Sequence, residues 1–144
     1  MRSILIATHG YLADGVKSLL SIIGDNQAKI TYINAYVDDT PYSDQLSSFF
    51  KTTHQDDEIV IFSDLYGGSV NQKLMQYIDS PNVFLISGFN ISIILEVLYQ
   101  PSPLSNKILS DLIENSRQHL QLVKPIEVTE ETNSDDFFKS EVIK

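Results

Sequence analysis

The sequence predicts a single doubly wound α/β domain whose mainly parallel sheet has the strand order 2-1-3-4. Four short runs rich in apolar and β-branched residues each precede a stretch with helical spacing. The runs are apolar throughout instead of alternating, which is typical of parallel strands covered by helices on both faces. Strand–helix alternation with short connections gives right-handed crossovers, and in the usual strand order of such sheets strand one lies beside strand three. With 144 residues, 42% of them hydrophobic, the chain can fill one core.

Each expected strand is followed by a helix with its own start or stop signal. The strands are expected at residues 3–7, 29–37, 58–63 and 83–87. The first helix ends at Gly24 as a C-cap residue, and its apolar face consists of Leu12, Val16, Leu19, Leu20 and Ile23. The second helix is marked by Leu46, Phe49 and Phe50. The third begins with Ser69 followed by Gln72, a capping-box pattern, and the fourth has Asn90 as N-cap.

A fifth helix and an acidic segment complete the chain. The helix is expected to open at Ser102 and Pro103, as an N-cap and N1 pair, and to end before Pro125. Its apolar face consists of Leu104, Ile108, Leu112, Ile113, Leu120 and Val123. The domain is therefore expected to span residues 1–125. Residues 126–144 hold six acidic residues against two lysines, and we expect either an acidic tail or an antiparallel strand added to a sheet edge.

Composition and charge exclude several classes of function. A net charge of -9, with Arg2 and Arg117 as the arginines, provides no basic stripe for a nucleic acid. There is no cysteine, which excludes disulfides and thiolate metal sites, and no close cluster of His, Asp and Glu indicates a metal. The N-terminus lacks signal-peptide features, and the most apolar stretch, residues 91–99, is shorter than the ~20 residues that span a bilayer. We expect a cytoplasmic protein that is not embedded in a membrane and needs no cofactor or metal.

The candidate site lies where the strands end. Reactive groups of open α/β sheets gather at the carboxyl ends of the strands. His9 follows the first strand and Asp64 follows the third, and these strands are neighbours in the expected order. Gly67, Gly68 and Ser69 then open the next helix beside them. The sequence therefore predicts that His9 and Asp64 lie close together at one edge of the sheet.

These residue types suit a transient phosphohistidine. An imidazole with one free nitrogen is a nucleophile near neutral pH, and a carboxylate on the other nitrogen fixes its tautomer and stabilises the cation formed. Glycines and free backbone N–H groups at a helix start can bind the phosphoryl group. The pattern predicts His9 as acceptor, Asp64 as its brace, and Gly68 and Ser69 at the phosphate. Taken singly, the same residues are also typical of a structural histidine, a turn-bracing aspartate and a tight turn into a helix.

Three segments carry a resemblance to a known family. The runs "ILIATHG" (4–10), "FSDLYGGSVNQ" (62–72) and "LISGFNISIILEVL" (85–98) resemble, in order and spacing, landmarks of the mannose-family IIA component of the bacterial phosphoenolpyruvate-dependent sugar phosphotransferase system. The resemblance covers residues 1–125, and its most specific part is the early "HG" paired with the later "D-x-x-G-G-S". Val70 and Ser92 stand where the family usually has proline, a change that removes no reactive group.

The resemblance implies a place in a phosphoryl relay. His9 would accept a phosphoryl group from the histidine-containing phosphocarrier protein and pass it to a histidine of a IIB component, which phosphorylates the incoming sugar. Asp64 would orient His9, and Gly68 and Ser69 would contact the phosphoryl group. The family also implies a homodimer whose C-terminal strand crosses to the partner subunit. No IIB domain follows in this sequence, so we expect the next carrier to be a separate polypeptide.

Two other classes of phosphoryl-transfer protein fit the sequence less well. A histidine phosphatase needs an arginine beside its histidine, where this chain has Thr8, and a phospho-aspartate receiver needs an acidic magnesium pocket after strand one. A phosphotransfer subunit of a dihydroxyacetone kinase, with the same fold and a histidine at the same place, stays open as an alternative. A non-catalytic flavodoxin-like binding module also stays open, although no P-loop or G-x-G-x-x-G is present. We expect His54 in a solvated loop and His119 on the polar face of a helix.

Overall fold

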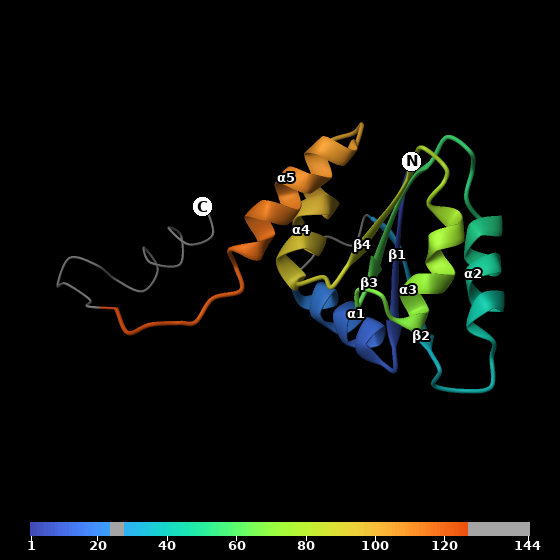
Figure 1. The fold of residues 1–144 in the computed structure, drawn as a ribbon, viewed down its shortest axis with the longest axis horizontal. Coiled ribbons are helices and arrows are strands. Elements are labelled where there is room, and N and C mark those ends of the chain that lie inside the picture. Colours follow the sequence, from blue (N-terminus) through green and yellow to red (C-terminus); the bar gives the residue numbers. More distant parts are fainter. Residues whose placement is uncertain (24–27, 127–144) are drawn as a thin grey trace.

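Strands and helices alternate along the chain. The computed structural model describes residues 1–23 and 28–126, and in this part four strands alternate with helices (Figure 1). The first half contains β1 (Arg2–His9), α1 (Leu12–Ile23), β2 (Lys29–Ala35), α2 (Tyr42–Lys51) and β3 (Glu58–Ser63). The second half contains α3 (Ser69–Leu74), a 3₁₀ turn η1 (Met75–Tyr77), β4 (Val83–Ser87), α4 (Ile91–Tyr99) and α5 (Asn106–Arg117).

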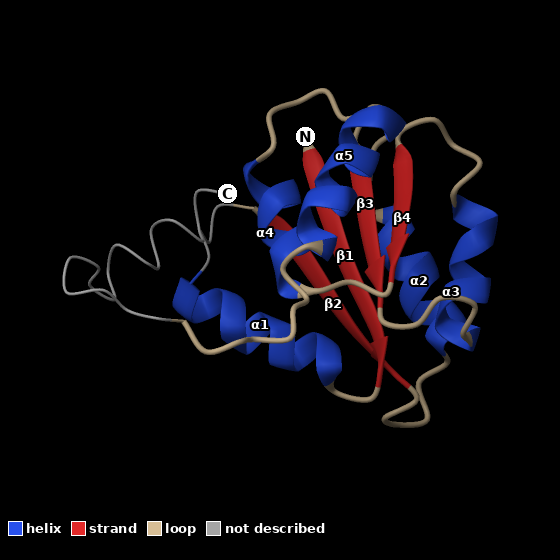
Figure 2. Cartoon of the chain, turned by 60° about the vertical axis from the view of Figure 1, so that its left-hand side comes forward, coloured by secondary structure: helices blue, strands red, loops and turns tan. Residues whose placement is uncertain are grey.

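The four strands form one parallel sheet in the order β2-β1-β3-β4, as predicted. In the register of the sheet, His9 pairs with Ala35 of β2, and Ala7 pairs with Ser63 of β3. Because the strands are parallel, their carboxyl ends meet at one edge of the sheet, where the arrowheads point in Figure 2. The register therefore places the residues after β3 beside the end of β1.

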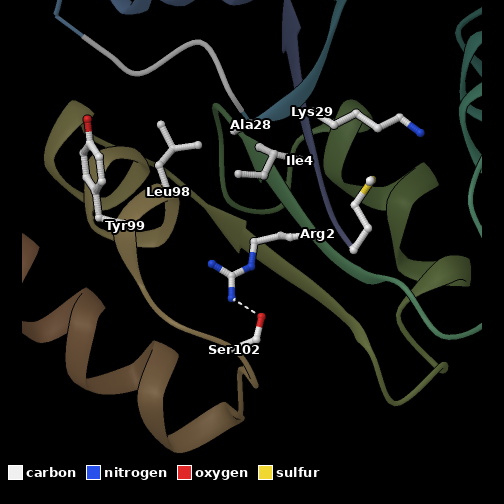
Figure 3. Close-up of a pocket in the computed structure, with 8 residues that line it drawn as sticks. Arg2, Ile4, Ala28, Lys29, Leu98, Tyr99 and Ser102 are labelled. Carbon is white, nitrogen blue, oxygen red and sulfur yellow. Dashed lines mark hydrogen bonds between the residues drawn. The ribbon is translucent and has the colours of Figure 1, made fainter.

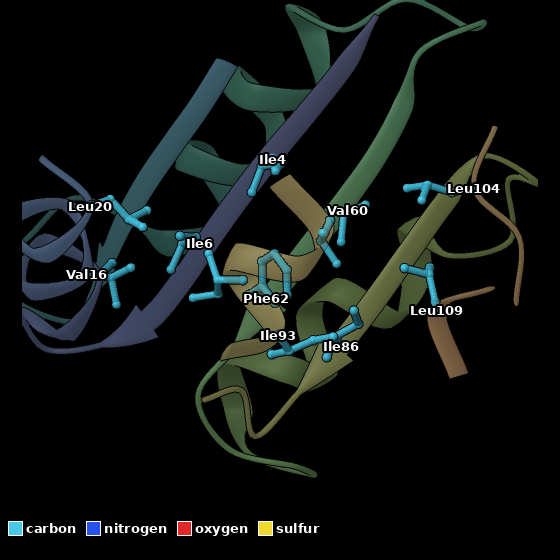
Figure 4. Packing of buried hydrophobic residues seen from close by; sticks show 13 residues of the cluster. Ile4, Ile6, Val16, Leu20, Val60, Phe62, Ile86, Ile93, Leu104 and Leu109 are labelled. Atoms are coloured by element: carbon cyan, nitrogen blue, oxygen red, sulfur yellow. The ribbon is translucent and has the colours of Figure 1, made fainter. Parts of the chain in front are cut away.

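Helices cover both faces of the sheet, each over its own apolar core. Alternate residues of β1 and β3 point to opposite faces, so each strand supplies both cores. Helices α1, α4 and α5 pack on one face, around a cluster that includes Ile4, Ile6, Val60, Phe62, Ile86 and Ile93 (Figure 4). Helices α2 and α3 pack on the other face, around Leu5, Ala7, Ile33, Leu46, Phe49, Ile61, Val70 and Leu74. The sheet is therefore doubly wound, as the unbroken apolar strands predict.

Side chains from the strand ends fix the first turn of α1. The Thr8 hydroxyl oxygen accepts a hydrogen bond from the backbone N–H of Ala13 at 2.8 Å, and the Asn34 side-chain oxygen of β2 accepts one from Asp14 at 3.2 Å. Both bonds satisfy donors that a helix start leaves free. The turn that carries His9 is thereby held between two fixed elements.

The fifth helix begins later than predicted. Its N-cap is Ser105, whose side chain accepts a hydrogen bond from the backbone N–H of Ile108 at 3.1 Å, and it ends at Arg117. Ser102 donates instead to the Glu58 carboxylate at 2.7 Å. A partner on β3 therefore engages the serine that was expected to cap the helix, and Ser105, three residues further on, caps it instead. Because the helix ends at Arg117, well before Pro125, Leu120 and Val123, which were expected on its apolar face, lie beyond its end and are 85% and 86% exposed.

A network of hydrogen bonds around Arg2 joins the start of β1 to the end of α4. Arg2 donates from Nε and Nη2 to Glu58 Oε1 at 3.3 and 3.0 Å, and from Nη1 to the carbonyl oxygens of Val97 and Gln100 at 2.9 and 2.6 Å. Its Nη2 also donates to Ser102 at 3.1 Å. All three guanidinium nitrogens are therefore engaged, at the edge of the sheet opposite to His9.

Two expectations lie outside the described residues. They are the C-cap at Gly24 and the edge strand or acidic tail over nearly all of residues 126–144. Within residues 1–23 and 28–126, no helix has the length and apolar character needed to cross a membrane.

Candidate phosphotransfer site

His9 is the last residue of β1 and stands at the carboxyl edge of the sheet. The backbone N–H of Gly10 donates to the carbonyl oxygen of Ala35 at 3.0 Å, which ties the turn after β1 to the end of β2. Gly10 has a φ of 59°, a left-handed conformation that favours glycine. The turn leaves the His9 side chain 35% exposed, so its ring is neither sealed in the core nor free in solvent.

Asp64 follows β3 directly and braces the imidazole. Its Oδ2 accepts the backbone N–H of His9 at 2.9 Å and lies 3.0 Å from His9 Nδ1, and Oδ1 lies 3.2 Å from the same nitrogen. An ionised carboxylate can only accept, so we assign the ring proton to Nδ1. The structure thus brings together the predicted pair and leaves Nε2 with its lone pair.

The loop after Asp64 places Ser69 and Gly68 against the ring. Ser69 Oγ lies 3.3 Å from His9 Nε2. A Cβ atom added to Gly68 would lie 3.4 Å from His9 Cε1 and 3.3 Å from Leu65 Cβ, so a glycine permits this close approach. The hydroxyl of Ser69 and the backbone of Gly68 therefore adjoin the open nitrogen and its neighbouring carbon.

The capping box predicted at Ser69 is wrong. The N-cap of α3 is Gly68, no side chain caps the helix, and Ser69 is its first helical residue. Gln72 instead donates from its side chain to the carbonyl oxygen of Gly67 at 3.4 Å. Because Gly68 already has the extended conformation of an N-cap, the Ser69 hydroxyl faces His9 instead of its own helix.

A buried polar network fixes α3 to the strand ends. Asn71 of α3 accepts with Oδ1 from the Ser87 hydroxyl of β4 at 2.6 Å, and the Ser63 hydroxyl of β3 lies 3.1 Å from the same atom. Ser63 also lies 2.8 Å from Ser87. Ser63 and Asn71 are buried, so these bonds form away from water, where they hold a fixed geometry. The network thereby positions α3, and with it Ser69, relative to Asp64.

Tyr36 lies beside His9, a position that the sequence did not reveal. We expected it inside a strand reaching residue 37, but β2 ends at Ala35. The Tyr36 ring centroid lies 5.6 Å from that of His9, at an interplanar angle of 40°. His9 pairs with Ala35 in the sheet, so Tyr36, the residue after Ala35, lies beside the turn that follows His9. Only the register of β1 and β2 predicts this position, and the sequence alone does not give that register.

The other histidines stand apart from this arrangement. His54 lies exposed in the loop between α2 and β3, as expected. His119 is exposed too, but it lies in the turn after α5 instead of on the helix, because α5 ends at Arg117. Across the described part of the chain, no three His, Cys, Asp or Glu side chains form a group that could hold a metal ion.

A hollow of about 490 Å³ lies at the opposite edge of the sheet. Figure 3 shows Arg2, Lys29, Leu98, Tyr99 and Ser102 around it. Arg2 is already bonded to Glu58, Ser102 and two carbonyl oxygens, so its charge is not offered to a ligand. Among the described residues, no histidine, aspartate or glutamate lines this hollow, so the pair of His9 and Asp64 at the carboxyl edge stays the candidate site.

The fold and the site together define a doubly wound α/β domain with a carboxylate-braced, partly exposed histidine at the carboxyl edge of its sheet. Comparison with protein families identifies the group to which such a domain belongs. Residues 3–116 match the family EIIA-man, described as the PTS system fructose IIA component. The chain is therefore a member of this IIA family of the sugar phosphotransferase system.

Solved structures with this fold include other proteins of the same system. A Klebsiella pneumoniae protein named as a phosphoenolpyruvate-dependent sugar phosphotransferase system permease is 26% identical, with a TM-score of 0.74 over 84% of this chain and 90% of its own. The mannose/sorbose specific IIA subunit from Enterococcus faecalis is 18% identical, with a TM-score of 0.72 over 89% and 98%. The PTS IIA protein associated with the fucose utilization operon of Streptococcus pneumoniae is 22% identical, with a TM-score of 0.64 over 84% and 92%. The last two likenesses concern the fold alone, and comparison with curated protein sequences gives no match.

Proposed function

We propose that the protein is a phosphoryl carrier of a sugar phosphotransferase system, with His9 Nε2 as the acceptor atom. The observation that carries this proposal is the contact of His9 Nδ1 with Asp64 Oδ2 at 3.0 Å, which leaves Nε2 unprotonated at an exposed edge. Membership of the IIA family supports the same chemistry.

The proposed transfer consumes no water and no proton. The Nε2 lone pair attacks the phosphorus of a phosphohistidine on the donor protein, and the donor's N–P bond breaks with its electron pair returning to the donor ring. The Nδ1 proton of His9 stays in place, so the phosphorylated ring is an imidazolium whose charge the Asp64 carboxylate offsets. Ser69 and Gly68 contact the phosphoryl group in this proposal. A histidine of a IIB component then attacks the same phosphorus, and the Nε2–P bond breaks with its electron pair returning to the His9 ring, which regains its starting form.

The surface beside His9 supports a protein as donor and acceptor. Several large apolar side chains follow His9 and Asp64 along the chain or contact the ring, and they are exposed: Tyr11, Leu12, Tyr36, Leu65 and Tyr66. Exposed apolar patches of this kind mark protein–protein contact sites. The proposed partners are the histidine-containing phosphocarrier protein and a IIB component, and the proposed assembly is a homodimer in the cytoplasm.

The test is phosphorylation of purified protein by phosphoenolpyruvate, the first enzyme of the system and the phosphocarrier protein. The expected product carries one phosphate that is labile in acid and stable in base, and His9→Ala abolishes it. The exposed histidines provide matched controls, because His54→Ala and His119→Ala are expected to accept phosphate like the unmodified protein. A phosphate retained in His9→Ala would contradict the proposal.

A further inference from the structure

Tyr36 holds an unfavourable backbone conformation beside the candidate nucleophile. Among residues 1–23 and 28–126 it is the one non-glycine residue with a positive φ, at 67°. An aromatic side chain in this left-handed region costs free energy, so the conformation persists only where its surroundings hold it. Such outliers cluster at functional sites, and this one adjoins His9.

Three contacts hold Tyr36 in place. The carbonyl oxygen of the preceding residue, Ala35, accepts the N–H of Gly10 at 3.0 Å. The Tyr36 ring lies 5.6 Å from the ring of His9 and 6.1 Å from that of Tyr42, centroid to centroid. Tyr42 is itself 2% exposed, and its hydroxyl donates to the carbonyl oxygen of Val70 at 3.2 Å. The Tyr36 ring therefore lies close to two other rings. One is the buried ring of Tyr42 in α2, and the other is the imidazole of His9.

Core packing does not account for this tyrosine. Its side chain is exposed, with 53% of the residue's surface open to solvent, so it contributes little buried area. Glycine or asparagine would adopt the same φ at a lower conformational cost. What the ring provides is an aromatic π-system tilted by 40° to the imidazole, at a centroid distance of 5.6 Å, within the range of about 6 Å in which a cation and an aromatic ring attract each other.

We propose that Tyr36 is a positioning residue for phosphoryl transfer at His9, whose ring stabilises the imidazolium present while the phosphoryl group is on Nε2. The inference rests on the proposed function. Asp64 offsets the positive charge at the Nδ1 edge of the ring, and Tyr36 acts on it through its π-system, 5.6 Å away from centroid to centroid. The contact strengthens when the ring becomes charged, so it favours the phosphorylated form of this protein over the phosphorylated form of its donor.

The test measures how the phosphoryl group distributes between the two proteins at equilibrium. Phosphorylated phosphocarrier protein, freed of phosphoenolpyruvate and the first enzyme, is mixed with an equal concentration of this protein, and both phosphorylated forms are counted by mass spectrometry. Tyr36→Gly and Tyr36→Asn remove the ring and are expected to shift the equilibrium about two- to fivefold toward the donor, the change that ~0.5–1 kcal/mol produces. Tyr36→Phe retains the ring and is expected to keep the equilibrium within about twofold.

Thermal unfolding of the same variants separates this role from a structural one. Tyr36→Gly relieves the conformational cost and is expected to unfold at the same temperature as the unmodified protein or at a higher one. An unchanged equilibrium in Tyr36→Gly and Tyr36→Asn overturns the inference, as does an equal loss in Tyr36→Phe. If the protein without substitutions accepts no phosphate on His9, the proposed function is wrong and this inference is wrong with it. Normal phosphorylation of His9 with no effect of Tyr36 refutes the inference alone.

Discussion

The carboxylate of Asp64 holds His9 at two points, accepting its backbone N–H at 2.9 Å and facing its ring Nδ1 at 3.0 Å with the same oxygen. The first bond fixes where β1 ends, and the second fixes how the side chain is turned. The protonation state of the ring follows from this geometry, because a carboxylate has no proton to give to Nδ1. Whether Nε2 carries a proton therefore depends on Asp64, a residue 55 positions further along the chain.

Replacing Asp64 with asparagine is expected to switch the tautomer of His9. With the amide oxygen in the place of Oδ2, where it still accepts the backbone N–H, the amide NH₂ takes the place of Oδ1, 3.2 Å from Nδ1, and is expected to donate to that nitrogen and make it an acceptor. The ring proton then moves to Nε2 and blocks the nucleophilic lone pair. We expect phosphoryl transfer in Asp64→Asn to slow by about 10²-fold or more, measured by rapid quench with phosphorylated phosphocarrier protein.

The control for this substitution is a carboxylate of the same type far from the site. Asp111 is 69% exposed and pairs with Lys107 on α5, so Asp111→Asn is expected to transfer at the normal rate. Thermal unfolding should show both variants folded. A normal rate in Asp64→Asn would remove Asp64 from the mechanism.

Glu58→Gln is expected to destabilise the protein in a manner that depends on pH. Burial would raise the pKa of Glu58, but hydrogen bonds from the Leu104 backbone, Ser102 and Arg2 outweigh it and hold the pKa below its usual value. Glutamine keeps the shape but loses the charge that receives these donors. We expect a loss of about 2–3 kcal/mol in the free energy of unfolding at pH 7, measured by urea denaturation.

The direction of the pH effect follows from the lowered pKa. A carboxyl group whose pKa is lower in the folded state stabilises the fold at pH values above its unfolded pKa, here near 4.5. This contribution disappears as the pH falls through the folded pKa. The difference between the unmodified protein and Glu58→Gln should therefore shrink below about pH 4.5. A difference that stays constant down to acid pH would show that the ion pair is not its source.

Two glycines offer the same substitution with opposite expected effects. Gly15 lies inside α1, and an added Cβ would meet no atom within 4 Å, so Gly15→Ala is expected to raise the free energy of unfolding by about 0.5–1 kcal/mol. Gly10 has equal space but a φ of 59°, so Gly10→Ala is expected to lower it by about 1 kcal/mol. Urea denaturation of both variants tests the pair. Changes of the same sign would contradict the assigned helical and left-handed conformations.

Ser3→Ala is expected to stabilise the protein. Ser3 lies in β1 with no exposed surface, and its hydroxyl finds no hydrogen-bond partner within the described residues. Burying such a group costs free energy that alanine avoids, so we expect a gain of about 1 kcal/mol in urea denaturation. Ser63 is equally buried but bonded to Asn71 and Ser87, so Ser63→Ala should lose stability. Destabilisation in Ser3→Ala would mean that its hydroxyl has a partner.

The sheet and the central pair of the site could be predicted because both follow from periodicity and topology. Apolar runs separated by helical spacings determine a parallel sheet, and the usual strand order then brings His9 to Asp64. Asn90 was also predictable as a cap, since its partner Ile93 is three residues away. In each case the deciding interaction is local or follows from the order of the strands.

What could not be predicted depends on contacts between distant residues. Ser102 has the local pattern of a helix cap, but Glu58 lies 44 residues away and binds it. Ser69 has the pattern of a capping box, yet its hydroxyl lies against His9, 60 residues earlier. Tyr36 has strong strand propensity, and its left-handed conformation depends on the His9 turn and on Tyr42. Propensity alone carries no information on such partners.

The single open nitrogen of His9 has a consequence for the order of events under the proposed function. Since Nδ1 is occupied by Asp64, loading and unloading use one atom and the same small area of surface. The donor protein and the acceptor protein therefore bind one after the other, and each excludes the other while it is bound. An excess of unphosphorylated donor protein should then slow phosphoryl transfer to the acceptor by competing for this surface. The overall rate of the relay also depends on how fast each complex dissociates.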